Sequence, residues 1–375
     1  MLPRGMSDTP ESDRLGEFPH PRETSVLFGQ DEAEHAVFDA FMSGRMHHAW
    51  LLTGPRGIGK ATLAYRMARF VLRYGVPDLA RAAKASGLSA EPADPVFRQV
   101  AAQSHPNLLV IRRPYDDKAK RLKTVITVEE VRRTSAFFGM SAGAGGWRVA
   151  IVDAADDMNV NAENALLKIL EEPPARSLFI LVSHQPGRLL PTIRSRCRTL
   201  TMKPLADEDI ARVLAASDVK AGEEERTAIA RLAEGSAGRA LAIAEGGGLD
   251  LYRDLVALLR PLPRLDVKGV HALADKVGRR GADEAYETFV ELLGDWLQRL
   301  VRCGAGAGAG PDLVAGEGAA MARLAAGAGL DRWVEVWEKI SRTVARAEAL
   351  NTDRKLVILN VFSMLESVAG ERIGA

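Results

Sequence analysis

The sequence predicts an α/β fold, in which a parallel sheet with helices on both faces is followed by helical domains. Short apolar runs alternate with helical patterns through about the first 200 residues, which is typical of a parallel sheet covered on both faces. A glycine-rich turn joins the first apolar run to the next helix, as in a P-loop domain. After about residue 203 the pattern is helical throughout.

Four short apolar runs are the expected strands, and helical patterns lie between them. The strands are expected at Ala49–Thr53, Leu108–Ile111, Val149–Val152 and Leu178–Val182. Helices are expected over residues 33–46, after Lys60, from Thr127 to about Phe138, and over Asn164–Glu172, where two prolines end the helix. Residues 76–106 have little clear pattern, and we expect a flexible loop at Gly139–Gly146.

The length of 375 residues suggests two or three domains. Residues 1–23 are rich in Pro, Ser and charge, and we expect a disordered tail there. Residues 24–203 form the expected nucleotide-binding-like domain, and 204–248 a small helical domain. Residues 249–375 form a larger helical domain. Its Ala/Gly-rich segment 304–329 is expected to be flexible, because glycine gives the chain freedom without a core.

Composition excludes several classes of protein. Lys and Arg total 50 against 49 Asp and Glu, so the net charge of +1 excludes a globally basic nucleic-acid coat and an acidic disordered chain. Two cysteines, Cys197 and Cys303, exclude a disulfide framework and a four-cysteine zinc module. The apolar runs are too short to span a bilayer, and the polar start does not resemble a secretory signal. We therefore expect a soluble intracellular protein.

The segment from Gly54 to Lys60 has the spacing of a phosphate-binding loop between a strand and a helix. Gly54, Gly57 and Gly59 would let backbone N–H groups converge on phosphate oxygens at a helix N-terminus, and Lys60 would reach the β- and γ-phosphates of ATP. The motif wants Ser or Thr after the lysine to hold Mg²⁺, but Ala61 stands there. A tight strand–helix turn with an incidental lysine is the alternative.

Asp153 ends the third expected strand, where it would lie near the metal of a bound nucleotide. ATPases of this general type commonly place a glutamate next, to activate water, but this chain has Ala154. General-base catalysis is worth about 10²–10⁴-fold, so its loss together with the Ser or Thr ligand should cripple hydrolysis. A strand-end cap is the alternative role for Asp153.

Two further candidates follow the fourth expected strand. Ser183 stands at its end, as a sensor of the γ-phosphate or as a simple strand terminus. Three arginines then fall within five residues, at 194, 196 and 198. Arg196, in Ser-Arg-Cys, is the candidate finger that stabilises a transferring phosphoryl group in trans. A solvated arginine cluster is the alternative.

These motifs together resemble the delta-prime family of clamp-loader subunits of bacterial DNA polymerase III, which are AAA+ proteins. The order of the motifs is more specific than any one of them, and the resemblance covers most of residues 25–245. The segments that carry it are LFGQDEAE (27–34), SGRMHHAWLLTGPRGIGKATLA (43–64), HPNLLVI (105–111), WRVAIVDAADDMNVNAENALLKILEEPP (147–174), LPTIRSRC (190–197) and, more weakly, EGSAGRAL (234–241).

The resemblance implies an AAA+ domain, a helical lid and a helical collar that joins subunits into a hetero-pentameric ring. It implies motor and clamp-opening subunits as partners, a sliding clamp loaded onto primer–template DNA, and a place in the cytoplasmic replisome without a membrane. The chain would be a non-catalytic stator of the holoenzyme that lends Arg196 to a neighbouring ATP site. ATP would bind without efficient hydrolysis.

Two departures from the family concern its metal and its lid. Many relatives carry a four-cysteine zinc module where residues 76–104 have no cysteine, so zinc is not expected. An active lid carries a sensor arginine two residues after Gly-Ser, whereas Arg239 comes one position late after Gly235-Ser236.

Three other readings remain open at the level of sequence. A self-contained AAA+ ATPase motor in DNA replication would use Lys60 and Asp153 to bind ATP-Mg²⁺, but Ala61 and Ala154 argue against it. A small-molecule P-loop kinase would not need two helical C-terminal domains. The basic stretch over residues 112–123 could touch DNA phosphates or form a solvated loop.

Overall fold

The computed structural model describes residues 10–139, 146–279, 281–308, 310–350 and 352–371. All of the predicted loop Gly139–Gly146 except its two end residues lies outside them, as do residues 1–9 of the predicted tail. The chain divides into two compact units. The first comprises Met1–Asp218 with Ala233–Leu241, and the second Val219–Leu232 with Ala242–Ala375.

A five-stranded parallel sheet forms the centre of the first unit, in the order β2-β5-β6-β1-β7. The four predicted strands are confirmed. β7 was not predicted, because its sequence RTLT is polar and largely exposed at the sheet edge. The strands are β1 (Ala49–Thr53), β2 (Leu108–Ile111), β5 (Arg148–Asp153), β6 (Ser177–Ser183) and β7 (Arg198–Thr201).

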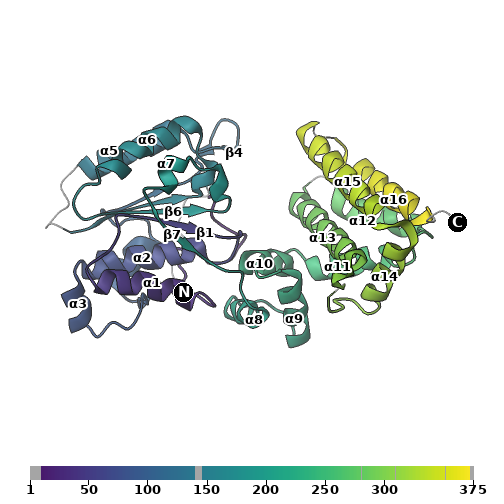
Figure 1. Cartoon of the computed structure of the whole chain (residues 1–375), viewed down its shortest axis with the longest axis horizontal. Helices are drawn as coiled ribbons and strands as arrows, with labels where there is room; N and C mark the ends of the chain where they lie inside the picture. Colours follow the sequence, from purple (N-terminus) through teal and green to yellow (C-terminus); the bar gives the residue numbers. More distant parts are fainter. Residues whose placement is uncertain (1–9, 140–145, 280, 309, 351, 372–375) are drawn as a thin grey trace. The chain divides into compact units, whose positions relative to one another are not determined.

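Helices cover both faces of this sheet, so the predicted fold class is confirmed (Figure 1). Trp50 and Leu52 of β1 pack in one cluster with α1 (Asp31–Met42) and α2 (Lys60–Tyr74). Leu51, which points the other way, packs in a second cluster with α5 (Val128–Gly139) and α6 (Val160–Glu171). Strands apolar on both faces arise because successive side chains alternate between two covered faces.

Several short elements of the first unit escaped prediction. α4 (Pro95–Ala101) starts at Asp94, whose Oδ1 accepts hydrogen bonds from the N–H groups of Val96 and Phe97, with proline at the first helical position. The basic stretch forms a two-stranded hairpin rather than a loop. The others are α3 (Pro77–Ala82), β3 (Tyr115–Asp116), β4 (Arg121–Leu122), α7 (Pro191–Arg194) and single 3-10 turns at Ala155–Asp157 and Pro186–Arg188.

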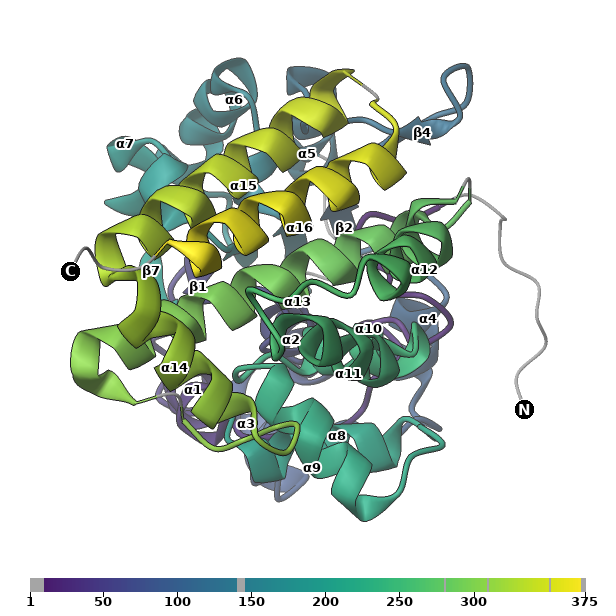
Figure 2. The same ribbon diagram turned by 90° about the vertical axis from the view of Figure 1, so that its right-hand side faces the viewer.

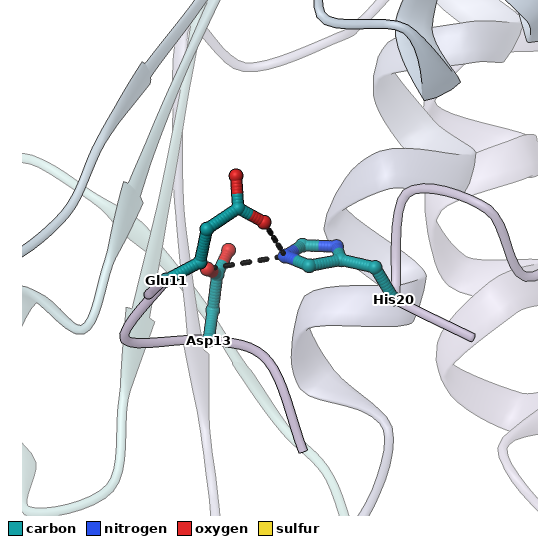
Figure 3. Close-up of side chains that lie close together, drawn as sticks. All are labelled: Glu11, Asp13 and His20. Carbon is teal, nitrogen blue, oxygen red and sulfur yellow. Dashed lines mark ion pairs between the residues drawn. The ribbon is translucent and has the colours of Figure 1, made fainter. Parts of the chain in front are cut away.

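The predicted disordered tail is wrong for residues 10–23. His20 and Arg22 are fully buried. The Arg22 guanidinium pairs with Glu11 at 2.6 Å, and Arg69 of α2 donates a hydrogen bond to the Arg22 carbonyl at 3.0 Å. Figure 3 shows Glu11 and Asp13 directed at the His20 ring. The segment is ordered because its charges meet partners in the fold, which its composition alone does not reveal.

The second unit is helical. Figure 2 shows α13, α15 and α16 running side by side within it. The remainder of α10 also belongs to this unit, whereas α8 (Asp207–Ala216) and the start of α10 belong to the first. The helices are α9 (Glu223–Leu232), α10 (Ala237–Glu245), α11 (Gly248–Leu259), α12 (Val267–Gly278), α13 (Asp283–Arg302), α14 (Glu317–Ala328), α15 (Leu330–Leu350) and α16 (Arg354–Gly370).

The predicted flexible segment 304–329 is wrong for residues 317–328, which form α14. Met321 and Leu324 are buried. Glu317, fully buried at the start of this helix, accepts hydrogen bonds from Arg299 at 2.8 Å and from the Tyr252 hydroxyl. The alanines and long apolar side chains here are strong helix formers, and the buried ion pair anchors the helix.

Among the described residues, no helix combines the length and apolar character that crossing a bilayer requires.

Candidate functional site

The predicted phosphate loop joins β1 to α2, with its three glycines in the left-handed half of backbone space. Gly54, Gly57 and Gly59 have φ angles of 136°, 73° and 96°. A Cβ atom at Gly54 would lie 2.5 Å from the Met202 carbonyl oxygen. This conformation and these contacts require glycine, because side-chain-bearing residues are strained at positive φ. The loop thus has the backbone shape on which the predicted phosphate contacts depend.

Lys60 begins α2 and closes the loop on itself. Its Nζ donates hydrogen bonds to the Gly54 carbonyl at 2.7 Å and to the Pro55 carbonyl. The side chain is buried, and this burial lowers the pKa of the ammonium group to about 8, while the Asp153 carboxylate opposes the shift. Lys60 therefore already has hydrogen-bond acceptors in place of phosphate oxygens.

Asp153 ends β5, and the charges of Asp153 and Lys60 each affect the pKa of the other group. Burial raises the pKa of its carboxyl group to about 7, Asp13 of the N-terminal segment adds to the rise, and Lys60 opposes it. The strand order places β6 between β1 and β5. The carboxyl ends of these three strands therefore lie together, at the edge where ligands bind in parallel α/β sheets.

Ser183, the predicted sensor, ends β6 with its hydroxyl buried and without a hydrogen-bond partner among the described residues. It has the parity of Leu181, which packs on the face covered by α5 and α6, and His184 is the next residue, in the bend after the strand. Burial lowers the pKa of His184 to about 4, and Lys60 lowers it further. His184 therefore lies close enough to Lys60 for the lysine charge to affect its pKa.

Asp156 is a second residue that sequence reasoning missed. Its two carboxylate oxygens accept hydrogen bonds from the backbone N–H groups of His184 at 3.0 Å and Gln185 at 3.2 Å. The carboxylate is buried and thereby fixes the chain where it leaves β6. The signal available was a second acidic residue three positions after Asp153, but nothing in the sequence names its backbone partners.

The Gly235–Gly238 segment packs directly on the phosphate loop, within the first unit. The Gly238 N–H donates a hydrogen bond to the Gly57 carbonyl at 2.9 Å. A Cβ atom at Gly57 would lie 2.2 Å from the Ser236 Oγ, and one at Gly238 would lie 3.0 Å from the Gly57 Cα. The backbones of Gly57 and Gly238 can therefore approach this closely because neither residue has a side chain.

The three clustered arginines have three different surroundings. Arg194, at the end of α7, is exposed. Arg196 donates hydrogen bonds to the Thr192 carbonyl at 2.9 Å and to Glu171 Oε1 at 2.7 Å, and its side chain keeps 33% of its exposure. The guanidinium of Arg198 lies over the Trp50 ring, 4.6 Å from its centroid. Arg196 is thus accessible and held in one pose.

One group of side chains has the composition of a metal site. Glu11, Asp13 and His20 bring their ligand atoms within 4.8 Å of one another (Figure 3). However, Arg112 pairs with Asp13 at 3.0 Å and with Glu11, which also pairs with Arg22. These arginines supply the positive charge that a cation would otherwise provide, so we interpret the group as an ion-pair network.

The basic stretch divides into paired and exposed cations. Arg112 belongs to the network above, and Arg113 pairs with Asp157 at 3.1 Å. Lys118, Lys120 and Arg121 are exposed on the hairpin. The first two cations thus attach the hairpin to the sheet domain, and only the rest remain solvated.

Known proteins similar to this chain match the region that contains the site. Residues 29–206 match the family model described as DNA polymerase III, delta subunit. DNA polymerase III subunit delta' of Pseudomonas aeruginosa is 41% identical over 152 residues, which are 40% of this chain and 41% of that one. Over this region the chain is similar to DNA polymerase III subunits delta'. The resemblance predicted from the motifs is confirmed.

Two further proteins show how much of the chain is similar to known sequences and structures. Subunit delta' of Escherichia coli is 31% identical over 207 residues, or 55% of this chain and 57% of that one. The chain thus spans about half the length of the curated relatives it matches. A gamma subunit-related protein of Thermotoga maritima aligns with 89% of this chain and 99% of its own at 16% identity and a TM-score of 0.47. The fold described above therefore rests on the strand order of the sheet and not on this similarity.

Proposed function

We propose that this chain is a stator subunit of a clamp loader in DNA replication. It would assemble with motor and clamp-opening subunits in a hetero-pentameric ring in the cytoplasm, with residues 204–248 as the lid and residues 249–375 as the collar. Through that assembly it would act on a sliding clamp and primer–template DNA. The similarity of residues 29–206 to the DNA polymerase III delta subunit model and to subunit delta' of Pseudomonas aeruginosa supports the proposal.

The observation that carries the proposal is Arg196. Its guanidinium is accessible, two hydrogen bonds hold it, and it follows the strand next to the phosphate-loop strand. An arginine so placed can stabilise charge on a γ-phosphate in a neighbouring subunit, which is worth about 10³–10⁵-fold in rate for arginine fingers. The chain's own site has Ala61 and Ala154 in place of the hydrolytic residues.

We further propose that the Lys60 site binds ATP weakly and without efficient hydrolysis. Gly54, Gly57, Gly59 and Lys60 would contact the phosphates and Asp153 would lie near the metal. Ser183 would sense the γ-phosphate from the end of β6, and His184, whose pKa Lys60 lowers, is a second candidate for that role. The alternative function, a self-contained ATPase motor, predicts ATP turnover by the isolated chain.

The test is Arg196→Ala in the reconstituted loader. We expect the rate at the one neighbouring ATP site to fall by about 10³-fold, so that total ATPase loses that site's share, while ring assembly stays intact. Arg194→Ala is the matched control, because that arginine is exposed two residues away. Unchanged ATPase in Arg196→Ala, or an equal loss in Arg194→Ala, would refute the assignment. Motor-like ATP turnover by the purified chain would favour the alternative.

A further inference from the structure

Glu171 is the side chain that holds Arg196 from another element. Its Oε1 accepts a hydrogen bond from the Arg196 Nη2 at 2.7 Å. Glu171 is the last residue of α6, and Arg196 follows α7, so the pair ties together two residues that lie 25 positions apart in the chain. Nothing in the Ser-Arg-Cys motif itself indicates this partner.

The hydrogen bonds to Arg196 engage only part of its guanidinium. An arginine has five N–H donors in a fixed, planar fork. In Arg196 one Nη1–H points to the Thr192 carbonyl and one Nη2–H to Glu171, which leaves three donors. The side chain retains 33% of its exposure. Phosphate oxygens could therefore bind the remaining donors while both present partners stay in place.

The pair is better suited to orienting the arginine than to blocking it. The two side chains are 33% and 49% exposed, and exposed ion pairs contribute little to stability. A phosphate group with several negative charges would outcompete a single carboxylate if the two sites overlapped. What the carboxylate does supply is restraint, because a free arginine must lose much rotamer freedom before it can act.

We propose that Glu171 is a positioning residue for Arg196, fixing the guanidinium before a neighbouring nucleotide arrives. This inference rests on the proposed function, in which Arg196 acts in trans. Fixing one flexible side chain in advance is worth about three- to tenfold in rate or affinity. Because Arg196 stabilises the transition state, loss of Glu171 should lower kcat of the assembled loader and leave KM for ATP unchanged.

The experiment measures steady-state ATPase of the reconstituted loader with Glu171→Ala, Glu171→Gln and the matched control Glu172→Ala. Glu172 is the next residue and is also exposed. We expect Glu171→Ala to lower kcat at the neighbouring site about three- to tenfold. Glu171→Gln keeps an oxygen acceptor and should recover part of that loss, and Glu172→Ala should match the unsubstituted loader.

A double substitution separates positioning from a general structural effect. If Glu171 acts through Arg196, adding Glu171→Ala to Arg196→Ala changes kcat no further. Additive losses, a KM change without a kcat change, or full activity in Glu171→Ala would overturn the inference while the loss in Arg196→Ala still upheld the proposed function. No loss in Arg196→Ala would overturn both.

Discussion

Replacing Gly57 by alanine tests whether the Gly235–Gly238 segment and the phosphate loop form one packed body. Gly57 has a φ of 73°, and its Cβ atom would lie 2.2 Å from the Ser236 Oγ and 3.0 Å from the Gly238 nitrogen. Gly75 is a matched control, because its φ is 68° and its Cβ would meet nothing within 4 Å. Only the first substitution therefore adds a steric conflict to the backbone strain.

The two variants share the cost of a left-handed alanine, about 1–2 kcal/mol. Gly57→Ala must also displace Ser236, whose Oγ accepts a hydrogen bond from the Arg239 N–H at 3.2 Å as a helix cap. Losing a cap costs about 0.5–2 kcal/mol, and overpacking adds about 1–3 kcal/mol. We therefore expect Gly57→Ala to be less stable than Gly75→Ala by about 1.5–5 kcal/mol.

Urea unfolding and hydrogen exchange measure this difference. The Gly238 amide, which donates to the Gly57 carbonyl, should exchange about tenfold faster or more in Gly57→Ala than in Gly75→Ala, since 1.4 kcal/mol is a factor of ten. Equal unfolding free energies in the two variants, with equal exchange at Gly238, would show that the segment does not rest on the loop in solution.

The remaining predictions concern buried charge. The pKa of Asp153 rises from 3.8 to about 7, so the folded chain binds the extra proton and loses stability as pH rises from about 4 to 7. Asp153→Asn removes that loss, so its gain in melting temperature over the parent chain should grow from pH 5 to pH 8; a constant gap contradicts it. Arg22→Ala breaks a buried pair with Glu11 and should cost about 3 kcal/mol in urea unfolding. The exposed Arg45→Ala should cost almost nothing, and equal losses would contradict the ion-network interpretation.

The sequence predicted the strands best where helices cover both faces of the sheet. Leu51 and Leu181 had to be apolar because helices cover both sides, so the strands that contain them were predictable. β7 is also a strand, but it lies at an exposed edge of the sheet, where polar residues are tolerated. Because burial is what requires apolar residues, this exposed strand has no hydrophobic pattern.

The predictions for charged segments were wrong for a different reason. Glu11 pairs with Arg112, 101 residues later, and no local pattern encodes such a partner. Polar composition therefore resembled a disordered tail, although Glu11, Asp13 and Arg22 meet charged partners in the fold. The same limit applies to Asp156, whose partners are backbone amides 28 and 29 residues away.

The sequence indicated which residues form the candidate site better than it indicated how their side chains are arranged. The loop glycines and Lys60 lie as the motif implies, because strand, turn and helix follow one another in the chain. The sensor position depends on which face of β6 each residue occupies, and one step along a strand reverses that face. The prediction of Ser183 depends on this single-residue choice at the end of β6, where His184 is the next residue.

The two cationic groups of the proposed mechanism differ in what a phosphate must displace. Lys60 already donates two hydrogen bonds to its own loop, and burial lowers the pKa of its ammonium group to about 8, so a triphosphate must break those bonds before it gains the lysine. Arg196 has N–H donors in reserve beyond Thr192 and Glu171 and needs to break neither contact. The free-energy cost of contacting phosphate is therefore lower at the outward arginine than at the chain's own loop. That difference favours a subunit that acts on a neighbour's nucleotide over one that turns over its own.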